Sequence, residues 1–322
     1  MEHRDVRKLE DQADCSNRLF GVTTRCAVLG LFAFASCSGG NGRALAAAPI
    51  ELAEPIRIDL HPSDRPILDV QFDGLQPRRF LVDTGSQSSL VAAACVRDLG
   101  LVARPHATSF QIRGSTAQER EVRDYVRVET LAVGALTVRD CRIAIVDDAA
   151  VAVAGIDGIL GQDLMARITT VFDMHQRAVY FLPGTGDDAV RAWLTKTKIA
   201  NGDWAIADVI HDPNPTAYVP VAGLAAAMAL TVDTGAQRTH LPKEALAAMK
   251  AVRKGSSPSE GIGGRRELAT YRVDQFDLYG LKIGLDVTEA QLESGLLGID
   301  VLGRLVFVMD GPARRMWMHL RG

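Results

Sequence analysis

Short apolar runs separated by polar segments make up most of the chain after residue 50, and these runs have the length of β-strands. The clearest strands are the alternating segments RAVYFL (177–182) and RRMWMHL (314–320). Glycine, proline and aspartate punctuate the runs, as is typical of turns between strands. Helical periodicity occurs over short stretches, at residues 91–100, 189–198 and 242–252. The pattern predicts a mostly β chain with a few short helices.

Two of the apolar runs end on the same three residues, Asp-Thr-Gly, at positions 83–85 and 233–235. Downstream of each triplet, the segments around Gly161 (within 157–182) and Gly298 (within 295–320) align without a gap. The aligned pairs are Gly161 and Gly298, Asp163 and Asp300, Arg167 and Arg304, Asp173 and Asp310, and Arg177 and Arg314. Agreement at so many positions indicates an internal repeat, in which each half forms a similar structural unit.

The repeat predicts two similar all-β lobes that can face each other across a pseudo-twofold axis. We expect the first lobe at residues 47–183 and the second at 202–322. Residues 184–201 would link the two lobes, and residues 1–46 would form a separate N-terminal leader. This arrangement would bring the two Asp-Thr-Gly loops together at the axis.

The leader has basic positions followed by the apolar run CAVLGLFAFAS (26–36) and then small residues. This order predicts an export signal, cleaved after Ala46, and hence a periplasmic or secreted protein. Alternatively, Phe34 to Cys37 resemble the box of a bacterial lipoprotein, in which Cys37 would carry a lipid anchor. A disordered tail is a third interpretation. Because no later segment has about 18 consecutive apolar residues, we expect no transmembrane helix.

Composition places the 322-residue chain among ordinary globular proteins, with 47% hydrophobic and 23% charged residues. Its net charge of −3 and the absence of a basic cluster give no reason to expect nucleic acid as a partner. Two cysteines follow the leader, Cys95 and Cys141, and they form either a disulfide or two buried thiols. No spacing of Cys and His resembles a zinc site.

The paired triplets suggest a chemistry for the carboxyl groups of Asp83 and Asp233. Two carboxyl groups within hydrogen-bonding distance cannot both ionise at low cost, so they share one proton and hold a water molecule between them. The ionised group would act as general base toward that water. The protonated group would polarise the scissile carbonyl, and a proton would then pass to the leaving amine. Such a hydrolysis requires no metal and no cofactor.

The neighbouring residues suit this chemistry. Gly85 and Gly235 allow the backbone to come close to the carboxylates. Thr84 and Thr234 would tie the two loops together through their hydroxyl groups. Ser86 would give the first carboxylate a hydrogen bond, whereas the second repeat has alanine at the equivalent position. The two acids are therefore expected to be inequivalent.

These motifs resemble those of aspartic proteases of the pepsin and retropepsin clan, in particular the bacterial retropepsin-like proteins. The resemblance extends over residues 51–320 and rests on both triplets and on the apolar-apolar-Gly elements at 159–161 and 296–298. It implies two retropepsin-like β-barrel lobes, with the apolar elements threading beneath the catalytic loops. It also implies that Asp83 and Asp233 are the catalytic pair and that the substrate is a peptide or an unfolded protein.

Glycine-bearing hairpins at residues 113–118 and 261–266 resemble two retropepsin-type flaps, one in each lobe. Pepsin-like enzymes instead carry a flap tyrosine in the first lobe, but Tyr125 lies beyond the expected hairpin tip. The residues expected to bind substrate at the two tips are Gly114, Ser115, Ile262 and Gly263.

Four other polar residues near these motifs are assigned structural positions. Asp157, Asp163 and Asp300 are interpreted as turn and helix-start residues, and His240 as a surface or strand-end residue. The leading hypothesis is an aspartic endopeptidase that is active as a monomer, because one chain supplies both acids. A catalytically idle relative that binds peptides in the cell envelope, and an envelope scaffold with turn-forming acids, remain as alternatives.

Overall fold

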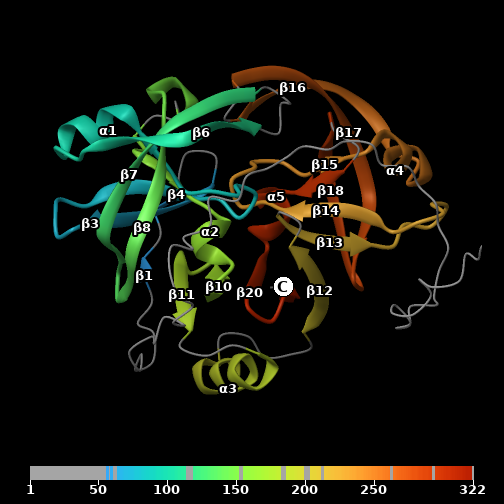
Figure 1. The fold of residues 1–322 in the computed structure, drawn as a ribbon. Helices are drawn as coiled ribbons and strands as arrows, with labels where there is room; N and C mark the ends of the chain where they lie inside the picture. The colour runs from blue at the N-terminus through green and yellow to red at the C-terminus, as the bar shows by residue number, and fades with distance from the viewer. Residues whose placement is uncertain are drawn as a thin grey trace, which may run out of the picture. The chain divides into compact units, whose positions relative to one another are not determined.

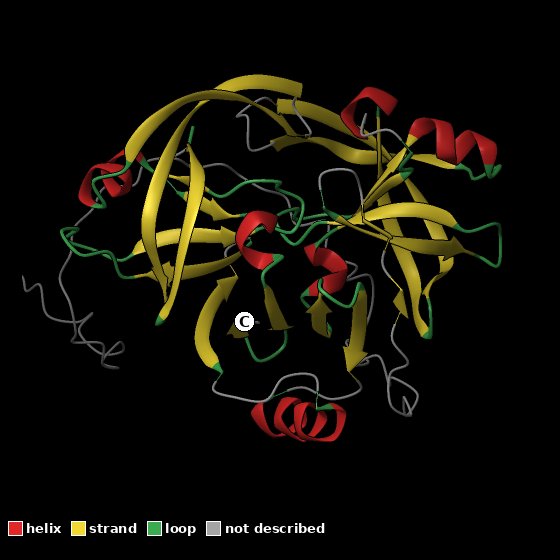
Figure 2. Ribbon diagram, turned by 180° about the vertical axis from the view of Figure 1, so that it is seen from behind, coloured by secondary structure: helices red, strands yellow, loops and turns green. Residues whose placement is uncertain are grey.

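The computed structural model describes residues 56–57, 59–60, 64–113, 119–151, 155–182, 186–198, 204–211, 214–261, 264–291 and 294–320. Every described residue belongs to one compact unit, which lies within Phe34–Gly322. Strands predominate in that unit, and its helices are few and short (Figure 2). The mostly β class predicted from the sequence is confirmed. The predicted leader lies outside the described residues.

The described helices are, in chain order, α1 (Ala93–Asp98), the 3-10 helix η1 (Asp148–Val151), α2 (Gln162–Met165), α3 (Asp187–Thr197), α4 (Lys243–Ala248) and α5 (Ile299–Leu302). Three of them, α1, α3 and α4, lie where the apolar pattern predicts helices. The helices α2 and α5 are single turns that follow the two apolar-apolar-Gly elements. They begin after Gly161 and Gly298, both of which have an extended backbone.

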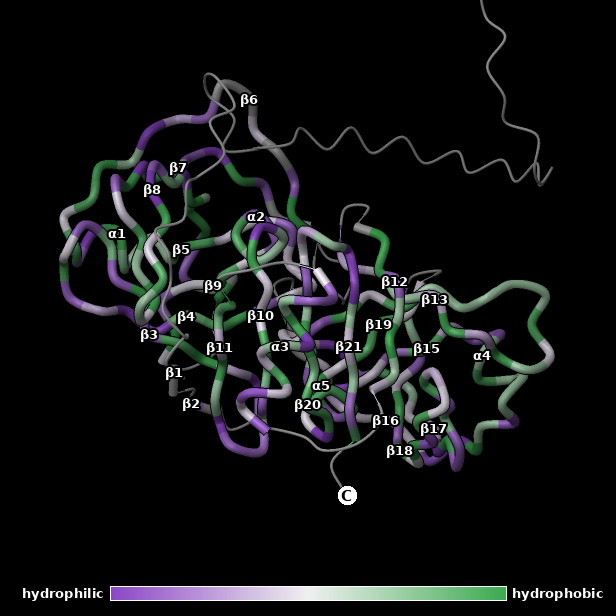
Figure 3. Tube along the Cα trace, turned by 90° about the horizontal axis from the view of Figure 1, so that it is seen from below, coloured by the Kyte–Doolittle hydropathy of each residue, from purple (hydrophilic) through white to green (hydrophobic). Residues whose placement is uncertain are grey.

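The first lobe is an eight-stranded sheet that closes on itself. Its order is β2 (Asp59–Leu60), β3 (Pro66–Phe72), β4 (Arg78–Val82), β9 (Gly158–Leu160), β5 (Leu90–Ala92), β8 (Leu136–Val146), β7 (Glu119–Val133) and β6 (Ala103–Arg113). An additional pairing of β3 with β7 closes the sheet into a barrel. Phe72 and Phe80 meet edge to face in its core, with ring centroids 5.5 Å apart. Figure 3 shows hydrophilic and hydrophobic residues mixed along β8, which contributes one side to this core.

A second, thirteen-stranded sheet contains the second lobe and the closing strands of both repeats (Figure 1). Its first six strands are β1 (Ile56–Arg57), β11 (Ala178–Leu182), β10 (Thr169–Asp173), β20 (Leu305–Asp310), β21 (Arg315–Leu320) and β12 (Ala205–His211). The order continues with β13 (Pro215–Val219), β14 (Met228–Val232), β19 (Gly295–Leu297), β15 (His240–Leu241), β18 (Leu281–Glu289), β17 (Gly264–Leu278) and β16 (Val252–Gly261).

The pairing of β10 with β20 joins the two repeats. Val171 lies opposite Val308 in this antiparallel pair. Each of these valines follows the glycine of its apolar-apolar-Gly element by the same number of residues, so they occupy equivalent positions in the repeat. The pseudo-twofold axis therefore passes between them, and the closing strands of the two repeats form one continuous sheet.

This shared sheet is buried on both faces. On one face Phe172 and Phe307 stack with ring centroids 4.6 Å apart, in the large core cluster common to both lobes. The opposite face carries Trp317, which is 1% exposed and belongs to a second cluster. Helix α3 covers that face through Val190, Trp193 and Leu194 (Figure 1). The sheet is thereby a rigid base for the loops at the axis.

Candidate active site

The two Asp-Thr-Gly loops are built in the same way. Each follows an apolar strand, β4 or β14, which pairs in parallel with the short strand β9 or β19. The Asp83 amide donates a hydrogen bond to the Leu160 carbonyl at 3.0 Å, and the Asp233 amide donates one to the Leu297 carbonyl at 3.0 Å. The apolar-apolar-Gly elements therefore support the loops from beneath and fix the position of each aspartate backbone.

Reciprocal hydrogen bonds between Thr84 and Thr234 tie the loops together. The Thr84 amide donates to Thr234 Oγ1 at 3.1 Å, and the Thr234 amide donates to Thr84 Oγ1 at 3.0 Å. Each hydroxyl also donates across the axis, from Thr84 to the Val232 carbonyl at 2.6 Å and from Thr234 to the Val82 carbonyl at 2.7 Å. Both threonines are 0% exposed. Four buried hydrogen bonds thus set the separation of the two aspartates.

The glycines of the triplets bring each loop against the opposite carboxylate. A β-carbon on Gly85 would lie 2.4 Å from Asp233 Cγ, and one on Gly235 would lie 2.3 Å from Asp83 Cγ. No larger residue fits at either position without displacing a carboxylate. The carboxyl groups of Asp83 and Asp233 are hydrogen-bonded to each other. The structure therefore brings together Asp83, Asp233 and the neighbouring threonines and glycines singled out in the sequence.

Burial raises the pKa of both carboxyl groups, because removal from water disfavours the charged form. The pKa of Asp233 lies well above its ordinary value, since the Asp83 charge and the hydrogen bond to Asp83 add to the effect of burial. For Asp83 the hydrogen bond with Asp233, the amides of Gly85 and Ser86, and the charge of Arg65 oppose the rise. The pair is thus suited to hold one shared proton.

The predicted role of the Ser86 side chain is wrong. Its hydroxyl donates to the Ser88 carbonyl at 2.9 Å, because a serine in a loop readily hydrogen-bonds to nearby backbone. Asp83 receives the backbone amide of Ser86 instead. Asp233 receives the amide of Ala236 in the same way, at 2.9 Å. Ser86 is therefore not the source of any difference between the two acids.

A hydroxyl residue missed by the sequence analysis supports each loop. Ser89 Oγ donates to Asp163 Oδ1 at 2.7 Å, and Thr239 Oγ1 donates to Asp300 Oδ1 at 2.7 Å. The same hydroxyls accept hydrogen bonds from the amides of Gly161 and Gly298, which directly precede α2 and α5. The repeat contained the signal, because both hydroxyl residues follow their aspartate by six positions (89 − 83 = 239 − 233). Burial raises the pKa of Asp163 and that of Asp300, and both lie in the first turns of the helices, as predicted.

Two further residues, Gln162 and Arg65, each contact one of the two Asp-Thr-Gly loops. Neither contact has a counterpart at the other loop, and no sequence pattern pointed to these residues. Gln162 Nε2 donates to the Thr84 carbonyl at 2.9 Å, whereas the second repeat has Ile299 at the equivalent position. Arg65, which is 6% exposed, donates from Nη1 to the Gly235 carbonyl at 3.3 Å. These contacts break the symmetry of the two loops.

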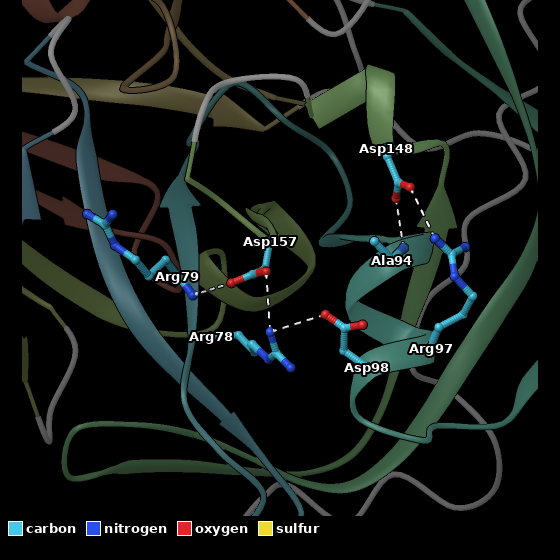
Figure 4. Close-up of polar contacts among 7 residues, drawn as sticks. All are labelled: Arg78, Arg79, Ala94, Arg97, Asp98, Asp148 and Asp157. Atoms are coloured by element: carbon cyan, nitrogen blue, oxygen red, sulfur yellow. Dashed lines mark hydrogen bonds and ion pairs between the residues drawn. The ribbon is translucent and has the colours of Figure 1, made fainter.

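Asp157 holds the strand that leads to Asp83 (Figure 4). The Arg79 amide donates to Asp157 Oδ2 at 3.0 Å. The Arg78 guanidinium lies 3.8 Å from Asp157 Oδ1 and 3.7 Å from Asp98 Oδ2 of α1. Asp157 therefore joins β4 to the segment before β9, in agreement with a structural role.

The predicted flap-tip residues Gly114, Ser115, Ile262 and Gly263 lie outside the described residues. Their stems are the antiparallel pairs β6–β7 and β16–β17, which are described up to Arg113↔Glu119 and Gly261↔Gly264. Tyr125 lies within the first stem, where its ring centroid is 4.8 Å from that of His106.

Burial decides two other expectations, for His240 and for the two cysteines. Of the two positions expected for His240, the strand end is confirmed, since His240 begins β15, and the surface is wrong, since His240 is 4% exposed. Burial lowers its pKa to about 4. Cys95 and Cys141 are both buried and form no disulfide with each other. Within the described part of the chain, no helix is long and apolar enough to cross a membrane. In the same residues, no group of three or more His, Cys, Asp or Glu side chains is placed to hold a metal ion.

Comparison with known proteins adds two findings. Residues 68–164, which include the first Asp-Thr-Gly loop, match the family model described as aspartyl protease. Among solved structures, the fold is similar to that of the aspartic proteinase from Irpex lacteus, with 15% sequence identity and a TM-score of 0.50. That similarity covers 84% of this chain and 98% of that one. A search of curated proteins gives no match.

Proposed function

Since the chain belongs to the aspartyl protease family and has the bilobal fold of a pepsin-like proteinase, we propose that it is an aspartic endopeptidase acting on peptides or unfolded proteins. The observation that carries the proposal is the hydrogen-bonded pair Asp83 and Asp233. The reciprocal bonds of Thr84 and Thr234 hold that pair in place. A protein that only bound peptides would gain nothing from holding two like charges together.

In the proposed mechanism the ionised Asp83 removes a proton from a water molecule, whose oxygen attacks the scissile carbonyl carbon. Asp233 gives its proton to the carbonyl oxygen, so that a neutral tetrahedral diol forms. Asp83 then returns its proton to the leaving nitrogen while the carbon–nitrogen bond breaks. Asp233 regains a proton from the diol, which collapses to the carboxylic acid. The dyad ends in its starting protonation state.

The test is hydrolysis of a reduced, alkylated protein across a pH series, with fragments identified by mass spectrometry. Asp83→Asn and Asp233→Asn should each lower the turnover by at least about a thousandfold, because one carboxyl group cannot act as base and acid at once. The double variant should be little worse than either single one. Asp69→Asn is the matched control, since Asp69 is exposed on β3. Near-normal turnover in Asp233→Asn would refute the proposal, and binding without cleavage by the unaltered protein would support the idle relative.

The same pH series should give a bell-shaped profile. Activity falls on the acid side when the dyad takes up its second proton and on the alkaline side when it loses its last. Because burial raises the pKa of both groups, the acid limb should lie above the pKa of an ordinary aspartate. A profile without an alkaline limb would contradict the shared proton.

We also propose that the protein acts outside the cytoplasm, on the basis of the basic, apolar and small-residue zones of residues 1–46. Mass spectrometry of the mature N-terminus tests this. A start at Ala47 supports a signal peptide, a lipidated Cys37 supports an anchored lipoprotein, and an uncleaved chain refutes export by either route.

A further inference from the structure

Gln162 is a buried amide residue that attaches the first catalytic loop to helix α2. It is the first residue of α2 and is 6% exposed. Its backbone amide donates to the Ser86 carbonyl at 2.8 Å, and its side-chain Nε2 donates to the Thr84 carbonyl at 2.9 Å. Gln162 therefore holds the loop at two carbonyls, one through its backbone and one through its side chain.

The second repeat keeps the backbone contact and lacks the side-chain contact. The Ile299 amide donates to the Ala236 carbonyl at 2.8 Å, just as the Gln162 amide donates to that of Ser86. Ile299 is also buried, at 4% exposed, but its side chain can donate no hydrogen bond. A loop of this kind therefore forms without a side-chain donor, and the amide group of Gln162 has a role particular to the first loop.

The peptide unit that Gln162 contacts is one that faces Asp83. Its carbonyl belongs to Thr84 and accepts from Gln162, while its N–H belongs to Gly85 and donates to Asp83 Oδ1 at 2.9 Å. Because a peptide unit is planar, a bond that fixes its carbonyl also fixes the direction of its N–H. Hydrogen bonds in such a chain also polarise and strengthen one another. Gln162 is thereby linked to the catalytic carboxyl group through one rigid amide.

The equivalent peptide unit of the second loop lacks such a link. Its N–H, that of Gly235, donates to Asp233 Oδ1 at 2.9 Å, but the side chain of Ile299 cannot donate to its carbonyl. The next peptide unit is contacted instead, since Arg65 Nη1 donates to the Gly235 carbonyl at 3.3 Å. The Gly235 amide is therefore an internal reference with which the Gly85 amide can be compared.

We propose that Gln162 is a positioning residue for the reaction, which holds the peptide unit between Thr84 and Gly85 so that its N–H stays directed at the Asp83 carboxyl group. This inference rests on the proposed peptidase function. Without the Gln162 donor the peptide unit can rotate, and the Asp83 carboxyl group then turns away from the orientation in which it works with Asp233. The effect falls on the chemical step, because Gln162 contacts the backbone of the loop and not a group of the substrate.

Two matched variants test the side-chain hydrogen bond. Gln162→Met keeps the length of the side chain and the backbone contact and removes the donor, whereas Ile299→Met introduces the same residue at the equivalent buried position, where no such bond is lost. We expect Gln162→Met to lower kcat by about tenfold and to change KM by less than about twofold. Ile299→Met should keep both values within about twofold of the unaltered protein. Similar losses in the two variants, or an unchanged kcat in Gln162→Met, would overturn the inference.

A second measurement requires no activity. In ¹⁵N-labelled protein, the amide proton of Gly85 reports on the hydrogen bond to Asp83, and that of Gly235 on the bond to Asp233. Gln162→Met should shift the Gly85 amide proton upfield and speed its exchange with solvent by about fivefold, and leave Gly235 unchanged. Gln162→Ile, which gives the first loop the residue of the second, replaces Gln162→Met if that variant does not fold. Equal changes at both glycines, or none at Gly85, would overturn the inference. A protein that cleaves no peptide but shows the selective change at Gly85 would refute the proposed function and leave the role of Gln162 in orienting Asp83 intact.

Discussion

Replacing Thr84 by valine tests whether the reciprocal hydrogen bonds hold the dyad in place. Valine has the shape of threonine, so the substitution opens no cavity at this fully buried position. It removes the hydroxyl that accepts from the Thr234 amide at 3.0 Å and donates to the Val232 carbonyl at 2.6 Å. The Thr234 amide would then be buried without a partner, and the Val232 carbonyl would lose the hydroxyl from which it accepts.

The structure sets the expected magnitude. A buried backbone donor left unsatisfied costs about 1–3 kcal/mol, and loss of the second hydrogen bond adds about 1 kcal/mol. Thr84→Val should therefore lower the free energy of unfolding by about 2–4 kcal/mol. Thr84→Ser keeps the hydroxyl and loses one methyl group, so it should cost only about 1 kcal/mol. The valine variant should also lose about tenfold to a hundredfold in kcat, because a small displacement of catalytic groups is costly.

Urea denaturation of both variants, with peptide hydrolysis measured on the same samples, gives these quantities. The control is Thr137→Val, since Thr137 is exposed on β8 and the substitution there should change neither stability nor turnover appreciably. If Thr84→Val cost no more than Thr84→Ser and kept full turnover, the reciprocal bonds would not be what holds the two aspartates at their working separation.

Three further predictions follow from burial and from the repeat. Burial lowers the pKa of His240 to about 4 from 6.5, so the unfolded chain binds a proton that the native chain does not, and stability falls as the pH drops through this window. The first repeat has Leu90 at the position of His240, so His240→Leu is the matched substitution. Between pH 7 and pH 5 the free energy of unfolding should fall by about 2 kcal/mol less in this variant than in the unaltered protein, as measured by urea denaturation at each pH. An equal fall in both proteins would show that His240 is not buried as described. Burial raises the pKa of Cys95 to about 11, and Cys141 is buried as well. Peptide mapping after thiol alkylation at pH 8 should therefore find both cysteines modified only after unfolding. Their modification in the native protein would contradict this. Specific activity should stay constant on dilution because one chain supplies both aspartates, whereas a loss that accompanies dissociation of a dimer would contradict a monomeric enzyme.

The sequence by itself determined the fold class, the repeat and the two residues that meet at the axis. Strand periodicity and turn residues are local signals, so they can be recognised in the sequence without knowledge of the tertiary structure. The Asp-Thr-Gly triplets were informative because two copies follow equivalent strands, and a twofold arrangement places equivalent loops together. The same offset also marked Ser89 and Thr239, although their role became clear only from the hydrogen bonds to Asp163 and Asp300.

Only the tertiary structure decided the features that depend on contacts between distant segments. Arg65 and Gly235 are 170 residues apart, and no local pattern reports a contact of that kind. The Ser86 hydroxyl donates to the Ser88 carbonyl, a partner that the conformation of the loop selects and the sequence does not reveal. His240 was expected at the surface or at a strand end; it begins β15, and β18 and β19 lie on both sides of that strand and exclude water. Local sequence sets which conformations a segment favours, whereas burial and charge are properties of the neighbours that the folded chain brings together.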